Sequence, residues 1–311
     1  MRICSLVPGA TEVVAALGQA SRLVGISHEC DFPLSVRHAP VLVEPCIEAT
    51  TTDSAAIDRE VRALVSSGRP LYRLNERAFA TSKPDVILTQ DLCHVCAITP
   101  DQLTRAVAAL PIHPTWLTLN PTTLADVISD VERIGAAIDR PSEGKVLAAS
   151  LRTRLASVQH GHRSKRPRVA CLEWLSPLYA GGHWVPEMVE LAGGSDALGL
   201  AHHPSRPVTW EQVESARPDI VILMPCGFSV DRAWRELAAL QHTDRRWSSA
   251  IASWPLTFVV DAASYFSRPG PRLVDGVELL ASIFATGSAG KLDDTAARAV
   301  PCSSPLLASP L

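Results

Sequence analysis

Apolar and polar positions along the chain predict strands that alternate with helices. Two β-prone runs, residues 2–6 and 168–172, each begin with an arginine and lead toward a helical segment. Those helical segments, residues 8–18 and 186–194, carry proline near the start and glycine near the end, as helices commonly do. Two further runs, residues 83–88 and 217–223, share a basic residue, Pro and Asp before branched apolar residues, which favours buried strands. This duplication predicts two similar α/β lobes.

The spacing of these segments predicts where the lobes begin and end. We expect an N-terminal α/β lobe over residues 1–120 and a C-terminal α/β lobe over residues 167–285. Residues 121–166 form a helical connection, because apolar residues recur at the helical period over 122–138 and again after Pro141. The second helix would span roughly 27 Å at about 1.5 Å per residue, enough for a strut between the lobes. Residues 286–311 are rich in small and polar residues, which predicts a disordered tail.

Composition and charge exclude several classes of protein. The 311 residues carry 29 Lys plus Arg against 32 Asp plus Glu, a net charge of −3, so we expect no nucleic-acid partner. No apolar run reaches the roughly 18 residues of a membrane span, so no membrane insertion is expected. The N-terminal residues carry no visible export signal, which predicts a cytoplasmic location. Neither a nucleophile elbow, a P-loop nor a dinucleotide fingerprint occurs.

Four of the eight cysteines follow predicted strands. Cys93 and Cys96 form a CxxC pair directly after one strand, and Cys30 and Cys226 follow two others. The loops at the carboxyl ends of parallel strands bind ligands in α/β proteins, so these thiols are candidate ligands for zinc or an iron-sulfur cluster. Free cysteines are also common as small core residues. That structural role is favoured for the remaining four, Cys4, Cys46, Cys171 and Cys302.

Two loops of the second lobe combine aromatic and polar residues. The first joins a strand to a helix and contains two glycines followed by His183, with Trp174 and Trp184 on either side. Its backbone can approach a ligand while the indoles flank it, although tryptophans in a packed loop core would give the same pattern. The second loop places Tyr265, Phe266 and Arg268 before a Pro-Gly-Pro turn. We expect it to form a cleft wall with an arginine available to an anion, or an ordinary capping loop.

Several segments together resemble the cobalamin-binding and iron-chelate-binding proteins of ABC importers. They are residues 2–18, 23–33, 83–88, 192–194, 210–223 and 265–272, and the similarity extends over nearly residues 2–285. The resemblance implies two Rossmann-like lobes joined by a single long helix, a ligand cleft between them, and an ABC transporter partner. It also implies ligand contacts from the loop of His28, Glu29 and Cys30, from the loop of residues 174–184, and from Tyr265. The cysteines and the absence of a visible export signal suggest a cytoplasmic, cysteine-rich branch.

Two functional hypotheses follow. The first is a binding protein for a metal-containing small molecule, most simply a corrinoid such as cobalamin, because its aromatic side chains can stack on a macrocycle. The second is an enzyme or sensor that holds zinc or an iron-sulfur cluster on Cys30, Cys93, Cys96 and Cys226.

Overall fold

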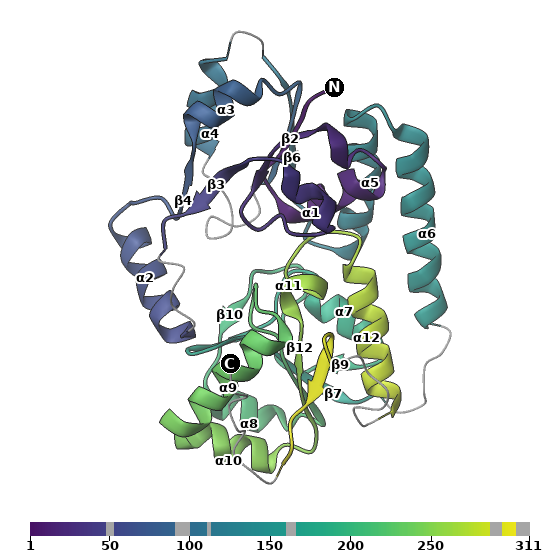
Figure 1. Cartoon of the computed structure of the whole chain (residues 1–311). Helices are drawn as coiled ribbons and strands as arrows, with labels where there is room; N and C mark the ends of the chain where they lie inside the picture. Colours follow the sequence, from purple (N-terminus) through teal and green to yellow (C-terminus); the bar gives the residue numbers. More distant parts are fainter. Residues whose placement is uncertain (48–52, 91–99, 111–112, 160–165, 287–293, 303–311) are drawn as a thin grey trace. The chain divides into compact units, whose positions relative to one another are not determined.

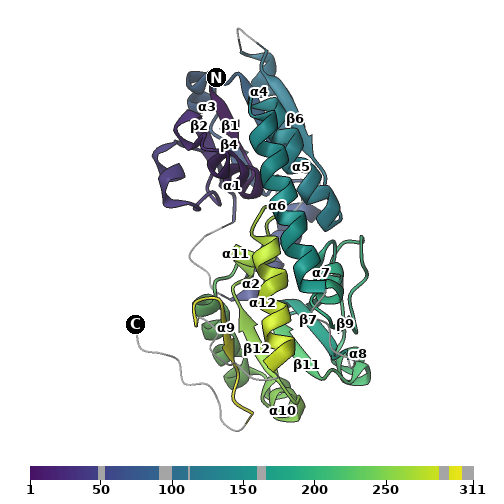
Figure 2. The ribbon, with the colours of Figure 1, turned by 90° about the vertical axis from the view of Figure 1, so that its right-hand side faces the viewer.

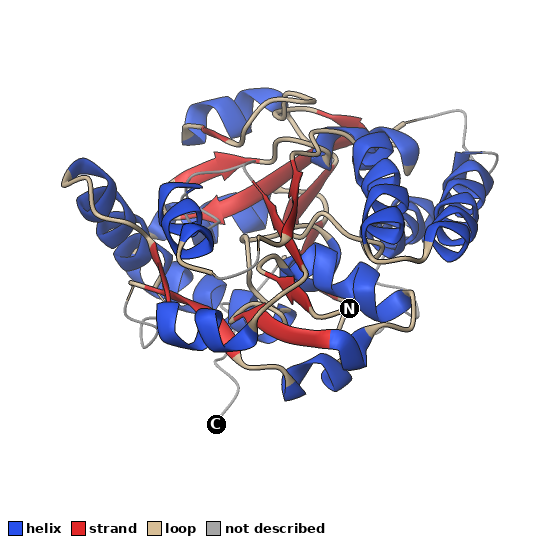
Figure 3. Cartoon of the chain, turned by 90° about the horizontal axis from the view of Figure 1, so that it is seen from above, coloured by secondary structure: helices blue, strands red, loops and turns tan. Residues whose placement is uncertain are grey.

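The computed structural model describes residues 1–47, 53–90, 100–110, 113–159, 166–286 and 294–302, and the chain separates into two compact units (Figure 1). Unit 1 contains Met1–Thr51, Arg59–Thr153 and Pro269–Pro271. Unit 2 contains Thr52–Asp58, Arg154–Arg268 and Arg272–Leu311. Strands and helices alternate along both units (Figure 3), which confirms the α/β class predicted from the sequence.

Unit 1 is built on a six-stranded sheet in the order β4-β3-β2-β1-β5-β6, in which only β4 runs antiparallel to its neighbour. The strands are β1 (Ile3–Ser5), β2 (Leu23–Ser27), β3 (Val41–Pro45), β4 (Tyr72–Leu74), β5 (Val86–Gln90) and β6 (Thr115–Leu119). The helices are α1 (Pro8–Ala16), η1 (Ala20–Arg22), η2 (Leu34–His38), α3 (Glu76–Ser82), α4 (Pro100–Ala108) and α5 (Leu124–Ala137). The residues of α2 (Ser54–Ser66) and α6 (Pro141–Gln159) are divided between the two units.

Unit 2 is built on a seven-stranded sheet in the order β10-β8-β7-β11-β12-β13, with β9 also paired to β7. The strands are β7 (Arg168–Leu175), β8 (Leu178–Ala180), β9 (Ser195–Asp196), β10 (Arg206–Pro207), β11 (Ile220–Leu223), β12 (Thr257–Val260) and β13 (Ala297–Ala299). The helices are α7 (Val185–Leu191), α8 (Trp210–Ala216), α9 (Val230–Thr243), α10 (Arg245–Ser253), α11 (Ala262–Tyr265) and α12 (Leu273–Thr286). Helices α7 and α12 lie side by side in both views (Figures 1 and 2).

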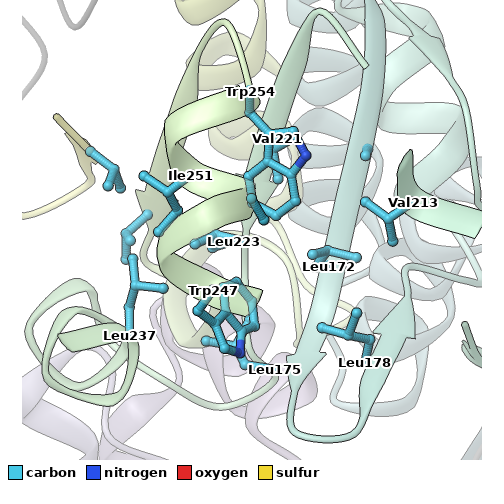
Figure 4. Packing of buried hydrophobic residues seen from close by; sticks show 14 of the residues in the cluster. Leu172, Leu175, Leu178, Val213, Val221, Leu223, Leu237, Trp247, Ile251 and Trp254 are labelled. Atoms are coloured by element: carbon cyan, nitrogen blue, oxygen red, sulfur yellow. The ribbon is translucent and has the colours of Figure 1, made fainter. Parts of the chain in front are cut away.

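A tryptophan-rich core fills one side of the unit 2 sheet. Trp247 of α10 and Trp254, directly after that helix, pack against Leu172, Val221 and Leu223 of the central strands (Figure 4). The three-stranded stretch β7-β11-β12 is parallel, and the four residues of β11 are all buried. Strands that are covered on both faces consist of continuous apolar runs. Such a run over residues 217–223 predicted a buried strand, which is β11.

Contacts of Arg2 and Asp85 join the start of β1 to the start of the neighbouring strand β5 in unit 1. The Arg2 backbone N–H donates to the Asp85 carboxylate at 2.6 Å, and the Arg2 guanidinium donates to the Ser82 carbonyl at the end of α3 at 2.7 and 2.9 Å. The helix ends at Lys83, which adopts the left-handed conformation with φ 41°. The cation therefore satisfies a helix carbonyl that has no partner within the helix.

Unit 2 repeats this arrangement. The Arg168 backbone N–H donates to the Asp219 carboxylate at 2.8 Å, and its guanidinium donates to the Ala216 carbonyl at the end of α8 at 2.7 and 3.0 Å. Arg217 ends that helix with φ 43°. The duplicated sequence pattern therefore encodes one strand-and-helix junction that occurs in each unit.

Glycine allows the backbone to approach closely at the start of α1. A Cβ atom at Gly9 would lie 2.1 Å from the Pro269 carbonyl oxygen, so only glycine fits between α1 and the Pro-Gly-Pro turn of unit 1. Pro8 occupies the first position of the helix, where its missing N–H costs nothing. The predicted helix over residues 8–18 is thereby confirmed as α1.

The two helices predicted over residues 122–138 and after Pro141 are present as α5 and α6, and their role as a connection between the lobes stays a prediction. Thr123 caps α5 in a capping box with Asp126. The prediction of disorder over residues 286–311 is wrong for the part that the structure describes, because β13 pairs antiparallel with β12. An edge strand has unpaired backbone groups that a passing segment can satisfy, and composition does not reveal this pairing.

Among the described helices, none is long and apolar enough to cross a membrane.

Candidate functional site

Three loops of unit 2 meet at one edge of its sheet. Strands β7, β11 and β12 are parallel, so their carboxyl ends lie at the same edge. The Cys226 backbone N–H donates to the Glu173 carbonyl at 3.0 Å, which joins the loop after β11 to β7. The Gly227 N–H donates to the Ser267 hydroxyl at 3.1 Å, which joins it to the loop after β12. The structure therefore places the segments of Trp174, Cys226 and Tyr265 together at this carboxyl edge of unit 2.

Trp174 is half-buried at the end of β7. Its indole N–H donates to the Ser54 carbonyl at 3.2 Å. Its ring meets Phe228 edge to face, with 5.5 Å between the ring centroids. Arg232 stacks on the other aromatic ring, with its Cζ atom 3.8 Å from the Phe228 centroid. The ring of Trp174 is therefore fixed by a hydrogen bond and by an aromatic neighbour, and it retains accessible surface.

The glycine-rich loop is held by a carboxylate that the sequence analysis did not select. Glu173 accepts hydrogen bonds from the Gly182 N–H at 3.1 Å and from the Ser205 hydroxyl at 2.7 Å. A Cβ atom at Gly182 would lie 2.4 Å from the Ser205 backbone nitrogen, so the two segments can approach only at a glycine. The two consecutive glycines were the sequence signal for this approach, but their partner is 23 residues away.

His183 adopts a conformation that is uncommon for a residue with a side chain. Its φ is 50°, and its backbone N–H donates to the His203 carbonyl at 2.6 Å, while the His202 N–H donates back to the His183 carbonyl at 2.9 Å. Burial lowers the pKa of the His183 imidazole below its ordinary value. The ring is therefore biased toward the neutral form, which is the form that binds metals.

Trp184, Phe266 and Arg268 are more buried than the sequence pattern suggested. Trp184 is 4% exposed and Phe266 is 2% exposed, and the Trp184 indole N–H donates to the Phe266 carbonyl at 2.8 Å. Arg268 is 7% exposed, so the expectation of an arginine available to an anion is not met, and the burial of Phe266 and Arg268 agrees with the alternative of an ordinary capping loop. The hydrogen bond joins the Trp184 indole to the backbone of the second loop, a partner that sequence spacing does not reveal. Tyr265 is half-buried.

In unit 1, His28 and Glu29 follow β2 at the carboxyl edge of the sheet. His28 Nδ1 lies 3.2 Å from the Val43 carbonyl and 3.4 Å from the Ser27 hydroxyl. Nε2 lies 3.3 Å from the Glu29 carboxylate. The Tyr72 ring is 5.7 Å from the imidazole ring, between centroids. Both ring nitrogens of His28 therefore face oxygen acceptors, the Val43 carbonyl and the Glu29 carboxylate.

Cys30 is buried against the start of α1. Its Sγ atom lies 3.0 Å from the Thr11 hydroxyl, which also donates to the Ser5 hydroxyl at 2.8 Å. Cys4 and Cys171 are fully buried in β1 and β7, and burial raises the pKa of both thiols well above the ordinary value. This burial confirms the structural role predicted for Cys4 and Cys171.

The metal hypothesis receives no support from the part of the chain that the structure describes. No group of three or more His, Cys, Asp and Glu side chains that could hold a metal ion occurs among the described residues. Cys93 and Cys96 lie outside those residues. Cys30 belongs to unit 1 and half-buried Cys226 belongs to unit 2.

A separate cavity in unit 1 lies away from all of these residues. Its volume is about 580 Å³, and its lining includes residues that precede or begin β1, β2 and β3. It is therefore at the amino edge of the sheet, opposite the loop of His28. Its other lining residues come from α3 and its cap, Asn75, Arg77, Ala78, Thr81 and Ser82.

A buried carboxylate next to Trp174 also escaped the sequence analysis. Glu236 of α9 accepts hydrogen bonds from the Ser54 backbone N–H at 2.9 Å and from the Ser54 hydroxyl. Burial raises the pKa of the Glu236 carboxyl, and the two hydrogen bonds partly offset this rise. Glu236 lies within an ordinary amphipathic helix and is separated from Ser54 by 182 residues, so no local signal could have identified the pair.

Two α/β units, each with aromatic and imidazole side chains in loops near the carboxyl ends of the parallel strands of its sheet, define a class of solute-binding protein. The chain belongs to the periplasmic binding protein family, whose model matches residues 3–246.

Individual relatives are distant in sequence but extend over most of the chain. The Vitamin B12-binding protein of Vibrio cholerae serotype O1 is 25% identical over 285 residues, which are 89% of this chain and 86% of the relative. The crystal structure of the periplasmic vitamin B12 binding protein BtuF of Vibrio cholerae has a TM-score of 0.64 at 20% identity and covers 91% of this chain and 96% of its own. A periplasmic heme binding protein from Pseudomonas aeruginosa has a TM-score of 0.66 at 18% identity, with 91% and 92% covered. These descriptions give no support to an enzyme, to a bound zinc or iron-sulfur cluster, or to a cytoplasmic, cysteine-rich branch.

Proposed function

We propose that this chain is a binding protein for a corrinoid such as cobalamin. The observation that carries the proposal is the half-buried indole of Trp174, held by two contacts at the carboxyl edge of unit 2 next to the loop of Tyr265. Flat aromatic faces bury a large area against a macrocycle at little cost in conformational entropy. The similarity to vitamin B12-binding proteins over most of the chain supports a corrinoid as the macrocycle.

Haem is the second candidate ligand. It is favoured by the imidazoles of the predicted site loops, His28 directly after β2 and His183, whose pKa burial lowers. A neutral imidazole nitrogen is a common axial ligand of haem iron. The similarity in fold to a heme binding protein is compatible with this ligand.

Titration of the purified protein with cobinamide, cyanocobalamin, haem and a ferric hydroxamate separates these candidates. A corrinoid ligand is expected to shift the visible corrin bands and to release heat in calorimetry, with a dissociation constant in the micromolar range or below. A haem ligand held by histidine is expected to shift the Soret band, and this shift should disappear in His28→Ala or His183→Ala. If none of the four probes produces a spectral shift or heat, the proposed function is wrong.

Two tryptophan variants test the site within the protein. Trp174→Phe removes the indole at the carboxyl edge and should weaken cobinamide binding about tenfold, which is the usual effect of losing an aromatic anchor. Trp234→Phe is the matched control, because that ring is also half-buried but lies beside Arg298, 6.0 Å from its centroid, outside every predicted site loop. Equal losses in both variants would contradict the assignment of Trp174.

We also propose that an ABC importer receives the ligand from this protein, as the resemblance to importer binding proteins implies. The test is ligand-dependent binding of the purified protein to a vitamin B12 importer reconstituted in lipid nanodiscs. Association that is the same as that of an unrelated soluble protein would contradict this partner.

A further inference from the structure

The ring of Trp174 is the end of a chain of contacts that begins on α9. Glu236 is 6% exposed, and its Oε1 atom accepts two hydrogen bonds from Ser54. The Ser54 carbonyl in turn accepts the Trp174 indole N–H at 3.2 Å. All three residues belong to unit 2. The carboxylate of α9 therefore fixes the backbone group to which the indole is bonded.

A second set of contacts, through Phe228, also links the ring of Trp174 to α9. Phe228 meets Trp174 edge to face, and Arg232 stacks on Phe228. Arg232 is one helical turn before Glu236 on α9, and its charge favours the ionised form of the Glu236 carboxyl. Both restraints on Trp174 thus lead to residues 228–236, and Arg232 and Glu236 of α9 belong to no predicted ligand loop.

Ser54 is a buried polar residue whose backbone N–H and hydroxyl both donate to Glu236. It is fully buried at the start of α2, where an N–H group has no partner within the helix. Asp53 accepts from the backbone N–H groups of Ala55 and Ala56 at 2.8 and 3.3 Å. The Ser54 N–H is therefore left for Glu236, which satisfies it together with the hydroxyl.

We infer that Glu236 is a positioning residue that holds Trp174, through Ser54, in the orientation that receives the macrocycle. The inference rests on the proposed function. Fixing an aromatic anchor before the ligand arrives removes an ordering cost from binding. Loss of Glu236 should therefore reduce affinity through Trp174 and not through a contact of its own.

Four variants and one double variant test this inference with cobinamide and haem as probes. Glu236→Ala is expected to weaken the probe that the wild type binds by about tenfold. Glu236→Gln keeps an oxygen that accepts from both Ser54 donors, so its affinity should stay within twofold of the wild type. Glu214→Ala, an exposed glutamate on α8, is the control and should bind as the wild type does. In Trp174→Phe, the added Glu236→Ala change should have no further effect on affinity.

Additive losses in the double variant would overturn the inference, because they would show that Glu236 acts independently of Trp174. If Glu236→Ala does not fold, Ser54→Ala replaces it, since it keeps both backbone groups and removes one hydrogen bond. It should weaken binding about threefold, and only when Trp174 is present.

A fluorescence measurement separates failure of this inference from failure of the proposed function. The emission of Trp174 is obtained as the difference between the wild type and Trp174→Phe, with and without Glu236→Ala in both. Acrylamide should quench this emission more strongly when Glu236 is replaced, even if no probe binds. Unchanged quenching would contradict the positioning role, whereas absence of binding with increased quenching would contradict only the function.

Discussion

Replacing Trp184 with phenylalanine separates a framework role from a ligand contact. The sequence pattern selects Trp174 and Trp184 equally, but the structure buries Trp184 and gives its indole N–H to the Phe266 carbonyl at 2.8 Å. In Trp184→Phe, this buried carbonyl loses its donor. We expect a large loss of stability and little change in affinity.

The magnitude follows from two contributions. A buried carbonyl without a donor costs about 1–3 kcal/mol. The smaller ring leaves roughly 40 Å³ unfilled, which adds about 1 kcal/mol at ~24 cal/mol per Å³ if the surroundings do not collapse. The free energy of unfolding should therefore fall by about 2–4 kcal/mol. At about 2–4 °C per kcal/mol, the melting temperature should fall by roughly 4–16 °C.

Thermal unfolding of the ligand-free protein, followed by circular dichroism and calorimetry, measures this change. Trp174→Phe is the control, because its indole is half-buried and makes a longer hydrogen bond of 3.2 Å. It should lose less stability and more affinity for cobinamide than Trp184→Phe does. A Trp184→Phe protein that melts with the wild type and binds tenfold more weakly would refute this reasoning.

Three further changes test the fold. Gly9→Ala should lower the free energy of unfolding by about 1–3 kcal/mol in urea, because the Cβ atom overlaps the Pro269 carbonyl; a stabilised variant would exclude that close approach. Burial raises the pKa of the Asp196 carboxyl from 3.8, so its contribution to stability is present below that pH and is lost as the pH rises through the folded pKa. Asp196→Asn should therefore gain stability relative to the wild type as the pH rises above about 4, and parallel pH profiles would contradict this. Arg154→Met removes ion pairs with two half-exposed carboxylates of α12, which should cost about 1 kcal/mol or less and should cost less in 1 M salt; a loss independent of salt would point to packing instead.

The sequence alone determined the duplicated strands β1, β5, β7 and β11 and several of the helices. Arg2 and Asp85 recur as Arg168 and Asp219 because the same junction between a strand and a helix end is built twice. Helices α5 and α6 follow from apolar residues at the helical period and from local capping signals. These features depend on neighbours within a few residues or on a repeated motif, so a linear pattern contains them. The family resemblance followed from the order of such motifs along the chain.

Only the tertiary structure decided which of the candidate side chains are accessible. Trp174 and Trp184 flank one predicted loop, yet Trp184 is buried with its indole N–H on the Phe266 carbonyl, while Trp174 is half-buried with its indole N–H on the Ser54 carbonyl. The pairing of β13 with β12 and the contact between Ser54 and Glu236 likewise join residues far apart in the sequence. In the folded chain, a buried donor or acceptor without a hydrogen-bond partner raises the free energy, so each one is paired. No local sequence pattern specifies which distant residue supplies that partner.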